Sequence, residues 1–162
     1  MQWRLICLKY VIKMLVHLNI GSNQGDRRAL IERAVALIVD ILQPAEWRVS
    51  SPVETPPWGF SSPFPFMNIG MDLQLPQMAP EALLDALQAI ERSISSMPHR
   101  NADGSYRDRE IDIDIILIDS LRMVSARLVL PHPRMLEREF VMRPLRELRP
   151  GWPDENQPSE CR

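Results

Sequence analysis

The 162-residue sequence lacks the features that mark several large classes of protein. It has two cysteines, Cys7 and Cys161, no C-x-x-C pair and no histidine cluster at zinc spacing, so we expect neither a disulfide framework nor a structural zinc site. Arg4, Lys9 and Lys13 break the N-terminal apolar runs well short of the roughly 20 residues of a membrane helix. The net charge of -2 gives no basic excess for nucleic acid. We therefore expect a cytoplasmic protein that binds neither membranes nor nucleic acids.

The length fits a single domain with one hydrophobic core. The first convincing strand begins at Met14. Residues 1–13 are therefore expected to be a dispensable extension, residues 14–150 the domain and residues 151–162 a frayed tail. We expect the protein to act as a monomer.

Apolar periodicity predicts an alternation of strands and helices. We expect strands over 14–20, 47–54 and 66–75, a helix capped by Asp26 that ends near Leu42, and a helix from Pro80 to Ser95. A strand over 109–118, a short strand pair near Met123 and Leu128 and a helix over 134–148 follow. The inward face of the first helix is predicted to hold Leu30, Ala34, Leu37, Ile38 and Ile41. This order predicts an α+β fold, a ferredoxin-like α/β sandwich in which a mainly antiparallel four-stranded sheet carries helices on one face.

Two long connections interrupt this pattern. Residues 55–65 are rich in proline and aromatic residues, and residues 97–108 are polar and lead directly into the strand at 109–118. Loops in such positions can close over a binding site.

Two acids stand on one face of that strand. Side chains alternate along a strand, so Asp112 and Asp114 project the same way, with Cα atoms roughly 7 Å apart. Carboxylates at this spacing can share one magnesium ion or a pair of ions, while Ile111, Ile113, Ile115 and Leu117 form the opposite face. A strand edge with two solvated acids explains the triplet equally well. A metal-dependent nuclease is a weaker interpretation, because the chain lacks a basic surface.

Seven motifs occur in the order typical of one enzyme family. They are Ile20–Asn23, Glu54–Pro57, Phe66–Asn68, Gln88–Glu91, Tyr106–Asp114, Leu130–Pro133 and Arg138–Leu145. From Met14 to about Pro150 the chain resembles the 6-hydroxymethyl-7,8-dihydropterin pyrophosphokinases of folate biosynthesis. The resemblance implies transfer of the β,γ-diphosphate of ATP to the hydroxymethyl group of the dihydropterin, with release of AMP and with two Mg²⁺ ions as cofactors. Such a transfer depends mainly on positioning and charge neutralisation.

The resemblance also implies roles for individual residues. The catalytic residues would be Arg109, Asp112 and Asp114, and the two aspartates would hold the metal. The residues that would contact ATP are Gln88, Glu91, Arg100, Arg109, Arg127, His132 and Arg138. The residues that would contact the pterin are Thr55, Pro56, Trp58, Phe66, Asn68, Tyr106, Asp112 and Phe140. A flat heterocycle calls for aromatic faces and a few amide partners, which suits these residue types.

The sequence departs from the family pattern at a few positions. Ser95 and Ser96 stand where the family usually has a Gly-Arg pair whose arginine assists catalysis, although Arg92 or Arg100 could compensate. Pro133 replaces a common tyrosine, and Trp58 replaces a smaller apolar residue. A catalytically weakened or inactive paralogue that still binds pterin or nucleotide is therefore an alternative to an active enzyme.

Overall fold

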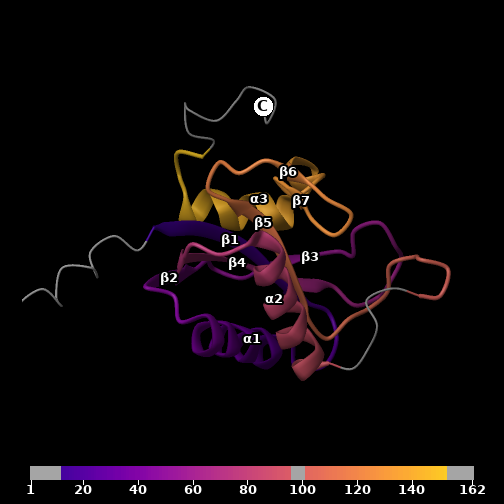
Figure 1. Cartoon of the computed structure of the whole chain (residues 1–162). Coiled ribbons are helices and arrows are strands. Elements are labelled where there is room, and N and C mark those ends of the chain that lie inside the picture. Colours follow the sequence, from indigo (N-terminus) through magenta and orange to yellow (C-terminus); the bar gives the residue numbers. More distant parts are fainter. Residues whose placement is uncertain (1–11, 96–100, 153–162) are drawn as a thin grey trace, which may run out of the picture.

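The computed structural model describes residues 12–95 and 101–152 (Figure 1). Their elements are, in order, β1 (Lys13–Ser22), α1 (Arg27–Leu42), β2 (Glu46–Val49), β3 (Val53–Thr55), β4 (Phe66–Pro76), α2 (Pro80–Ile94), β5 (Asp112–Ile118), β6 (Met123–Val124), β7 (Val129–Leu130), the 3-10 turn η1 (Met135–Glu137) and α3 (Glu139–Leu148). Asp26 caps α1 as expected, because its carboxylate accepts the N–H of Ala29 at 3.0 Å.

The main sheet is antiparallel and runs in the order β2-β4-β1-β5, and β3 also pairs with β4. Since β2 and β3 pair with different stretches of β4, five strands occupy four positions, and the α+β prediction is confirmed. The single strand predicted over 47–54 is wrong. It is interrupted between Val49 and Val53, where Pro52 has no N–H to donate and the Ser50 hydroxyl accepts the N–H of Gly70 instead.

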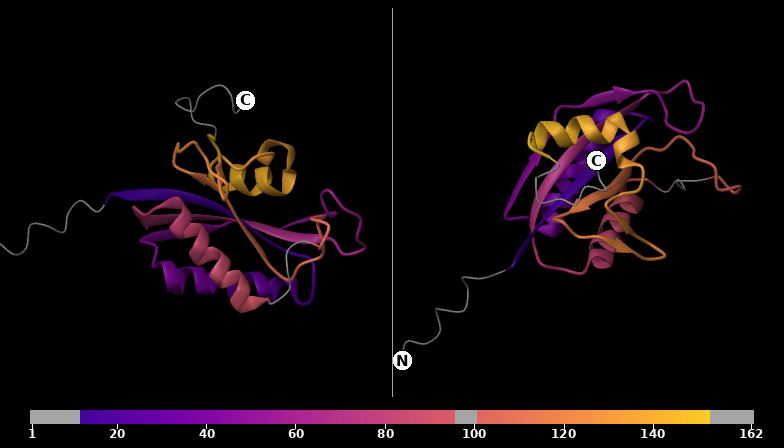
Figure 2. Two further views of the ribbon diagram at one scale, coloured as in Figure 1. Left: turned by 45° about the vertical axis from the view of Figure 1, so that its right-hand side comes forward. Right: turned by 90° about the horizontal axis from the view of Figure 1, so that it is seen from above.

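Helices cover both faces of the sheet, not one. Helices α1 and α2 lie against one face, where the main hydrophobic core is, and α3 lies against the other (Figures 1 and 2). The predicted inward face of α1 was partly wrong, because Ile41 is 54% exposed and Ile31 is buried beside Ala34 and Ile38. No helix of the described ranges is long and apolar enough to cross a membrane.

Strand β5 contains one irregularity. Leu18 of β1 pairs with Ile115 and His17 pairs with Leu117, so Ile116 is an extra residue in β5. Beyond this bulge the alternation is shifted, and Leu117 packs with Ile116 in the cluster beneath α3. The prediction that Leu117 shares a face with Ile113 and Ile115 was therefore wrong.

The helix predicted over 134–148 is also interrupted. The η1 turn ends at Glu137 and α3 begins at Glu139, while Arg138 between them has extended backbone angles. The break turns Arg138 away from the path that a continuous helix would give it. After α3, Trp152 is buried with Met142 and Leu145, which extends the packed core past Pro150.

The sheet face that carries α3 is polar. Three ranks of cross-strand partners run across β4, β1 and β5, and they are Asn68–Gly21–Asp112, Gly70–Asn19–Asp114 and Asp72–His17–Leu117. Helix α3 covers the third rank and the Gly70 end of the second, since Arg149 after the helix donates to Asp72 and a Cβ on Gly70 would lie 2.7 Å from the Cβ of Pro144 and 2.9 Å from His17. The first rank and the Asp114 end of the second are left for a site beyond the N-terminal end of α3.

Candidate active site

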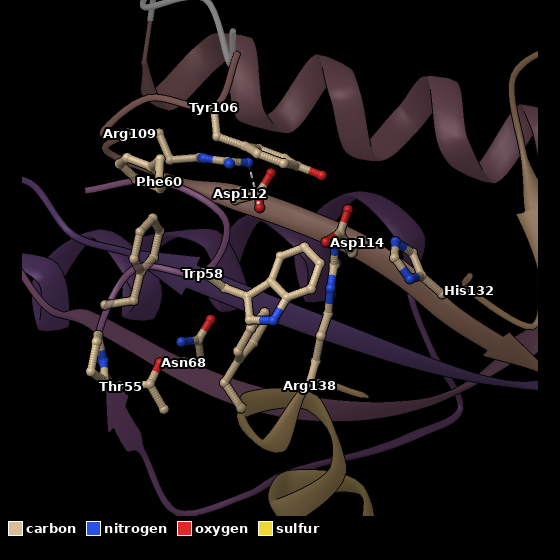
Figure 3. Close-up of a pocket in the computed structure, with 13 residues that line it drawn as sticks. Thr55, Trp58, Phe60, Asn68, Tyr106, Arg109, Asp112, Asp114, His132 and Arg138 are labelled. Carbon is tan, nitrogen blue, oxygen red and sulfur yellow. Dashed lines mark ion pairs between the residues drawn. The ribbon is translucent and has the colours of Figure 1, made fainter. Parts of the chain in front are cut away.

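A cavity of about 240 Å³ lies over those ranks (Figure 3). Its walls come from β3, β4 and β5, the two long loops and the segment that leads into α3. The lining residues are Thr55, Pro56, Trp58, Phe60, Phe66, Asn68, Tyr106, Arg109, Asp112, Asp114, His132, Arg138 and Phe140. All of the residues predicted to contact the pterin and all of the predicted catalytic residues are among them. Phe60 was not predicted, although it lies in the loop singled out for its aromatic residues.

The two acids face this cavity together. Burial, and then the charge of Asp112, raises the pKa of Asp114 to about 7. Arg109 offsets part of this charge, because its Nη1 lies 2.8 Å from Asp112 Oδ2. The pair is therefore a site of concentrated negative potential that a cation would relieve.

Arg109 is held from several sides. Its guanidinium lies 5.9 Å from the centroid of Phe66 and 5.7 Å from that of Tyr106. Its backbone is fixed by Asn23, whose Oδ1 accepts the Arg109 N–H at 2.9 Å. The Asn23 amide also donates to Asp108 at 2.6 Å and to the carbonyl of Phe64 at 3.2 Å. Asn23 thus ties both long loops to the start of α1, a role that its place in a quoted motif did not reveal.

His132 and Arg138 line the cavity beyond Asp114. The backbone N–H of His132 donates to the carbonyl of Ile116 at 2.9 Å, so the bulge of β5 fixes its position. Burial and the charge of Arg138 lower the pKa of His132 to about 4. The imidazole is therefore neutral at pH 7.

The opposite end of the cavity is built for a flat group. Phe60 and Phe66 meet edge to face with centroids 6.3 Å apart, and Phe140 lines the same cavity. Buried Asn68 is oriented by Asn19, whose Nδ2 donates to Asn68 Oδ1 at 3.3 Å. Gly21 leaves room for this amide, because a Cβ there would lie 2.4 Å from Asn68 Oδ1. Neither Asn19 nor Gly21 was predicted as part of the site.

Comparison with known proteins decides the family. The family model described as 7,8-dihydro-6-hydroxymethylpterin-pyrophosphokinase matches residues 17–150. The chain belongs to this pyrophosphokinase family. A Porphyromonas gingivalis protein named 2-amino-4-hydroxy-6-hydroxymethyldihydropteridine pyrophosphokinase is 41% identical over 140 residues, which cover 84% of this chain and 91% of that protein. A Bacillus subtilis protein of the same name is 33% identical over 134 residues, which cover 83% of this chain and 77% of its own length.

For a pyrophosphokinase the acid pair is a suitable metal site. Within the described ranges no group of three or more histidine, cysteine, aspartate or glutamate side chains could hold a metal ion. Mg²⁺ does not need such a group, since it is commonly held by one or two carboxylates together with substrate phosphates and water. Asp112 and Asp114 match that donor set.

Several predicted nucleotide contacts of the pyrophosphokinase lie outside the cavity. Glu91 is buried and accepts the N–H of Ile113 at 2.6 Å, so it supports the strand between the two acids. Arg127 forms an exposed ion pair with Asp85 of α2, and Gln88 does not line the cavity. Ser96 and Arg100 lie outside the described residues.

Proposed function

We propose that this chain transfers the β,γ-diphosphate of ATP to the hydroxymethyl oxygen of 6-hydroxymethyl-7,8-dihydropterin, giving AMP and the pterin diphosphate in folate biosynthesis. The observation that carries the proposal is the single cavity in which an acid pair, two arginines and an aromatic slot with one amide lie together. The names of the P. gingivalis and B. subtilis relatives support it.

The aromatic end would take the pterin. Phe66 and Phe140 supply faces on which a flat ring can stack, and Asn68 offers amide groups to the polar ring edge. Because Asn19 holds Oδ1 of Asn68, the amide is set before the ring arrives. Thr55 and Pro56 form the rim of this slot. A preset partner of this kind lowers the ordering cost of binding.

The acidic end would take the triphosphate. Asp112 and Asp114 would hold two Mg²⁺ ions, which neutralise phosphate charge and orient the transferred group when bound. Arg109 and Arg138 would donate to phosphate oxygens, since a guanidinium fork matches their geometry. Neutral His132 would offer an N–H without adding charge. Gln88, Glu91, Arg100 and Arg127 remain proposed nucleotide contacts.

The chain needs no nucleophilic side chain for this reaction, because the pterin hydroxyl attacks the β-phosphorus directly. Its residues would align the two substrates and exclude water. The loops that carry Trp58 and Tyr106 already touch, with ring centroids 6.5 Å apart. They would therefore form the cover that protects ATP from hydrolysis.

A catalytically inactive binding paralogue is not favoured by the comparisons, since the relatives carry the enzyme's name. The predicted catalytic residues Arg109, Asp112 and Asp114 also line one cavity. We further propose that the enzyme works as a monomer in the cytoplasm.

The deciding experiment supplies the purified chain with Mg-ATP and 6-hydroxymethyl-7,8-dihydropterin and separates the products by chromatography. AMP and pterin diphosphate should appear in equal amounts, and neither should form without the pterin. Binding of the pterin with no AMP above background would support the inactive paralogue instead.

A further inference from the structure

Arg138 is held by aromatic rings. Its side chain is largely buried, and its Nε has no hydrogen-bond partner. Within residues 12–95 and 101–152 no carboxylate lies within ion-pair distance of its guanidinium. The guanidinium carbon instead lies 4.5 Å from the ring centroid of Trp58 and 5.8 Å from that of Phe140. Trp58 is therefore the nearest aromatic support of this cation.

The contact between Trp58 and Arg138 crosses the boundary between the two ends of the cavity. Trp58 belongs to the loop after β3. This loop borders the ring slot, the end of the cavity that is lined by Phe66, Asn68 and Phe140. Arg138 lines the same cavity as the two acids, and in Figure 3 its guanidinium points toward Asp114. Trp58 and Arg138 lie next to each other in the same view.

A stacked guanidinium is well placed for phosphate. A guanidinium that lies flat on an aromatic ring keeps its N–H groups directed outward in its own plane. Loss of the ring would return rotational freedom to a long side chain, and phosphate binding would then have to restrict it again. Trp58 has a second cation, Arg134, at 5.7 Å from its centroid.

We propose that Trp58 is a positioning residue for Arg138, so that a side chain of the ring slot sets the affinity for the triphosphate. The inference rests on the proposed function, which makes the triphosphate the ligand of the acidic end. If Trp58 were only a wall of the slot, its truncation would weaken pterin binding and leave nucleotide binding unchanged.

The test measures nucleotide binding without pterin. The probe is Mg²⁺ with an ATP analogue that has a methylene group between the α- and β-phosphorus, the position that the reaction cleaves, and calorimetry gives its Kd. Trp58→Leu should raise this Kd about three- to thirtyfold, the range of a partly buried cation–π contact. Trp58→Phe should have an intermediate effect, because a smaller aromatic face remains.

Phe64→Leu is the matched control. Phe64 lies on the same loop, but its side chain is 50% exposed and does not line the cavity. The same truncation there should leave the Kd of the analogue within twofold of the native value. In steady state, Trp58→Leu should raise the KM for ATP and Phe64→Leu should not.

A double-mutant cycle separates positioning from a general loosening of the loop. In an Arg138→Gln background, Trp58→Leu should have no further effect on the Kd. An unchanged Kd in Trp58→Leu, or an equal loss in both backgrounds, would overturn the inference. Thermal unfolding checks that each variant is folded, and if Trp58→Leu is not, Trp58→Phe decides in the same cycle.

The outcomes also separate this inference from the proposed function. AMP formation by the native chain, with no effect of Trp58→Leu on the Kd, would refute the inference alone. A Trp58–Arg138 coupling in a chain that forms no AMP would refute the proposed activity alone. A native chain that does not bind the analogue would refute both.

Discussion

At the scale of single residues, Asp112 and Asp114 set the charge of the cavity. The pKa of Asp114 is raised by burial and by its neighbour, so the two carboxylates are close enough to oppose each other. Arg109 forms an ion pair with Asp112 and so offsets the charge of that carboxylate. A cation bound between the two carboxylates would favour the ionised form of both.

We predict that Asp114→Asn lowers kcat at least about a hundredfold, because a transition-state stabiliser of this kind contributes at that scale. Thermal unfolding without metal should be unchanged or shifted upward, since the substitution removes a repulsion. Glu110→Gln, which changes a nearby acid that does not line the cavity, is the control and should retain activity. A fully active Asp114→Asn would refute the metal assignment.

Gly21→Ala should damage the ring slot specifically. The new methyl group would lie 2.4 Å from Asn68 Oδ1, so the amide would have to move from its position. We expect the KM for the pterin to rise at least about tenfold, on the scale of one lost hydrogen bond to a bound ligand. The KM for ATP should change much less. Equal changes in both KM values would show a general disturbance of the sheet.

The local pattern of residues predicted the acid pair, and the family resemblance predicted the other site residues. The alternation around Asp112 and Asp114 is visible in a few consecutive letters. Asn19 and Gly21 could not be found in this way, because their importance comes from the register with Asn68 across two strands. Cross-strand register depends on packing of the whole sheet.

At the scale of elements, α3 is anchored by a buried polar cluster. His17 Nδ1 lies 2.8 Å from Asp72 Oδ1, and Arg149 donates to both oxygens of Asp72 at 2.9–3.1 Å. Arg48 adds a contact at 3.3 Å to Asp72 and one at 2.9 Å to the carbonyl of Leu148. The cluster fixes the C-terminal end of the helix whose opposite end presents Arg138 and Phe140.

This cluster predicts loss of stability in acid. Burial lowers the pKa of His17 below its ordinary value of 6.5, so the unfolded chain binds the proton more tightly and stability falls as the pH drops below 6.5. Burial alone would raise the pKa of Asp72, but hydrogen bonds from His17 and Arg149 outweigh it and hold the pKa at about 2. A further loss is therefore expected below pH 3.8.

We expect the free energy of unfolding to fall by up to about 1.4 kcal/mol per pH unit for each such histidine below pH 6.5. His132 contributes with the same sign, because its pKa is also lowered. Asp114 contributes with the opposite sign, because its pKa is raised to about 7. His17→Gln should therefore reduce the slope between pH 6 and 5 in urea titrations by up to about 1.4 kcal/mol per pH unit. An unchanged slope would contradict the neutral state of His17.

The elements themselves were largely predictable, and their interruptions were not. Periodicity located the strands and helices, because each buries one face. The break at Arg138, the bulge at Ile116 and the gap between β2 and β3 depend on contacts with distant strands. The placement of α3 on the opposite face also depends on packing.

At the scale of the whole molecule, both substrates would share one cavity whose walls come from separate parts of the chain. Ligands that bind only the folded state stabilise it by mass action, by about 2.7 kcal/mol at 100 times Kd. We predict that Mg²⁺ with the methylene ATP analogue raises the unfolding temperature. EDTA should abolish that shift, and Asp112→Asn should reduce it. A shift that is insensitive to EDTA would contradict metal-dependent nucleotide binding.

The two faces of the sheet divide the tasks of the protein. Helices α1 and α2 bury the main core on one face, while the cavity residues lie on the other. In a library of single substitutions, the positions that affect cellular abundance should therefore differ from those that affect activity. Cellular abundance should respond to changes at Val16, Leu18 or Leu87, whereas growth without external folate should also respond to Asp112, Asp114 and Asn68. Selection for abundance alone would let inactive chains persist in a population.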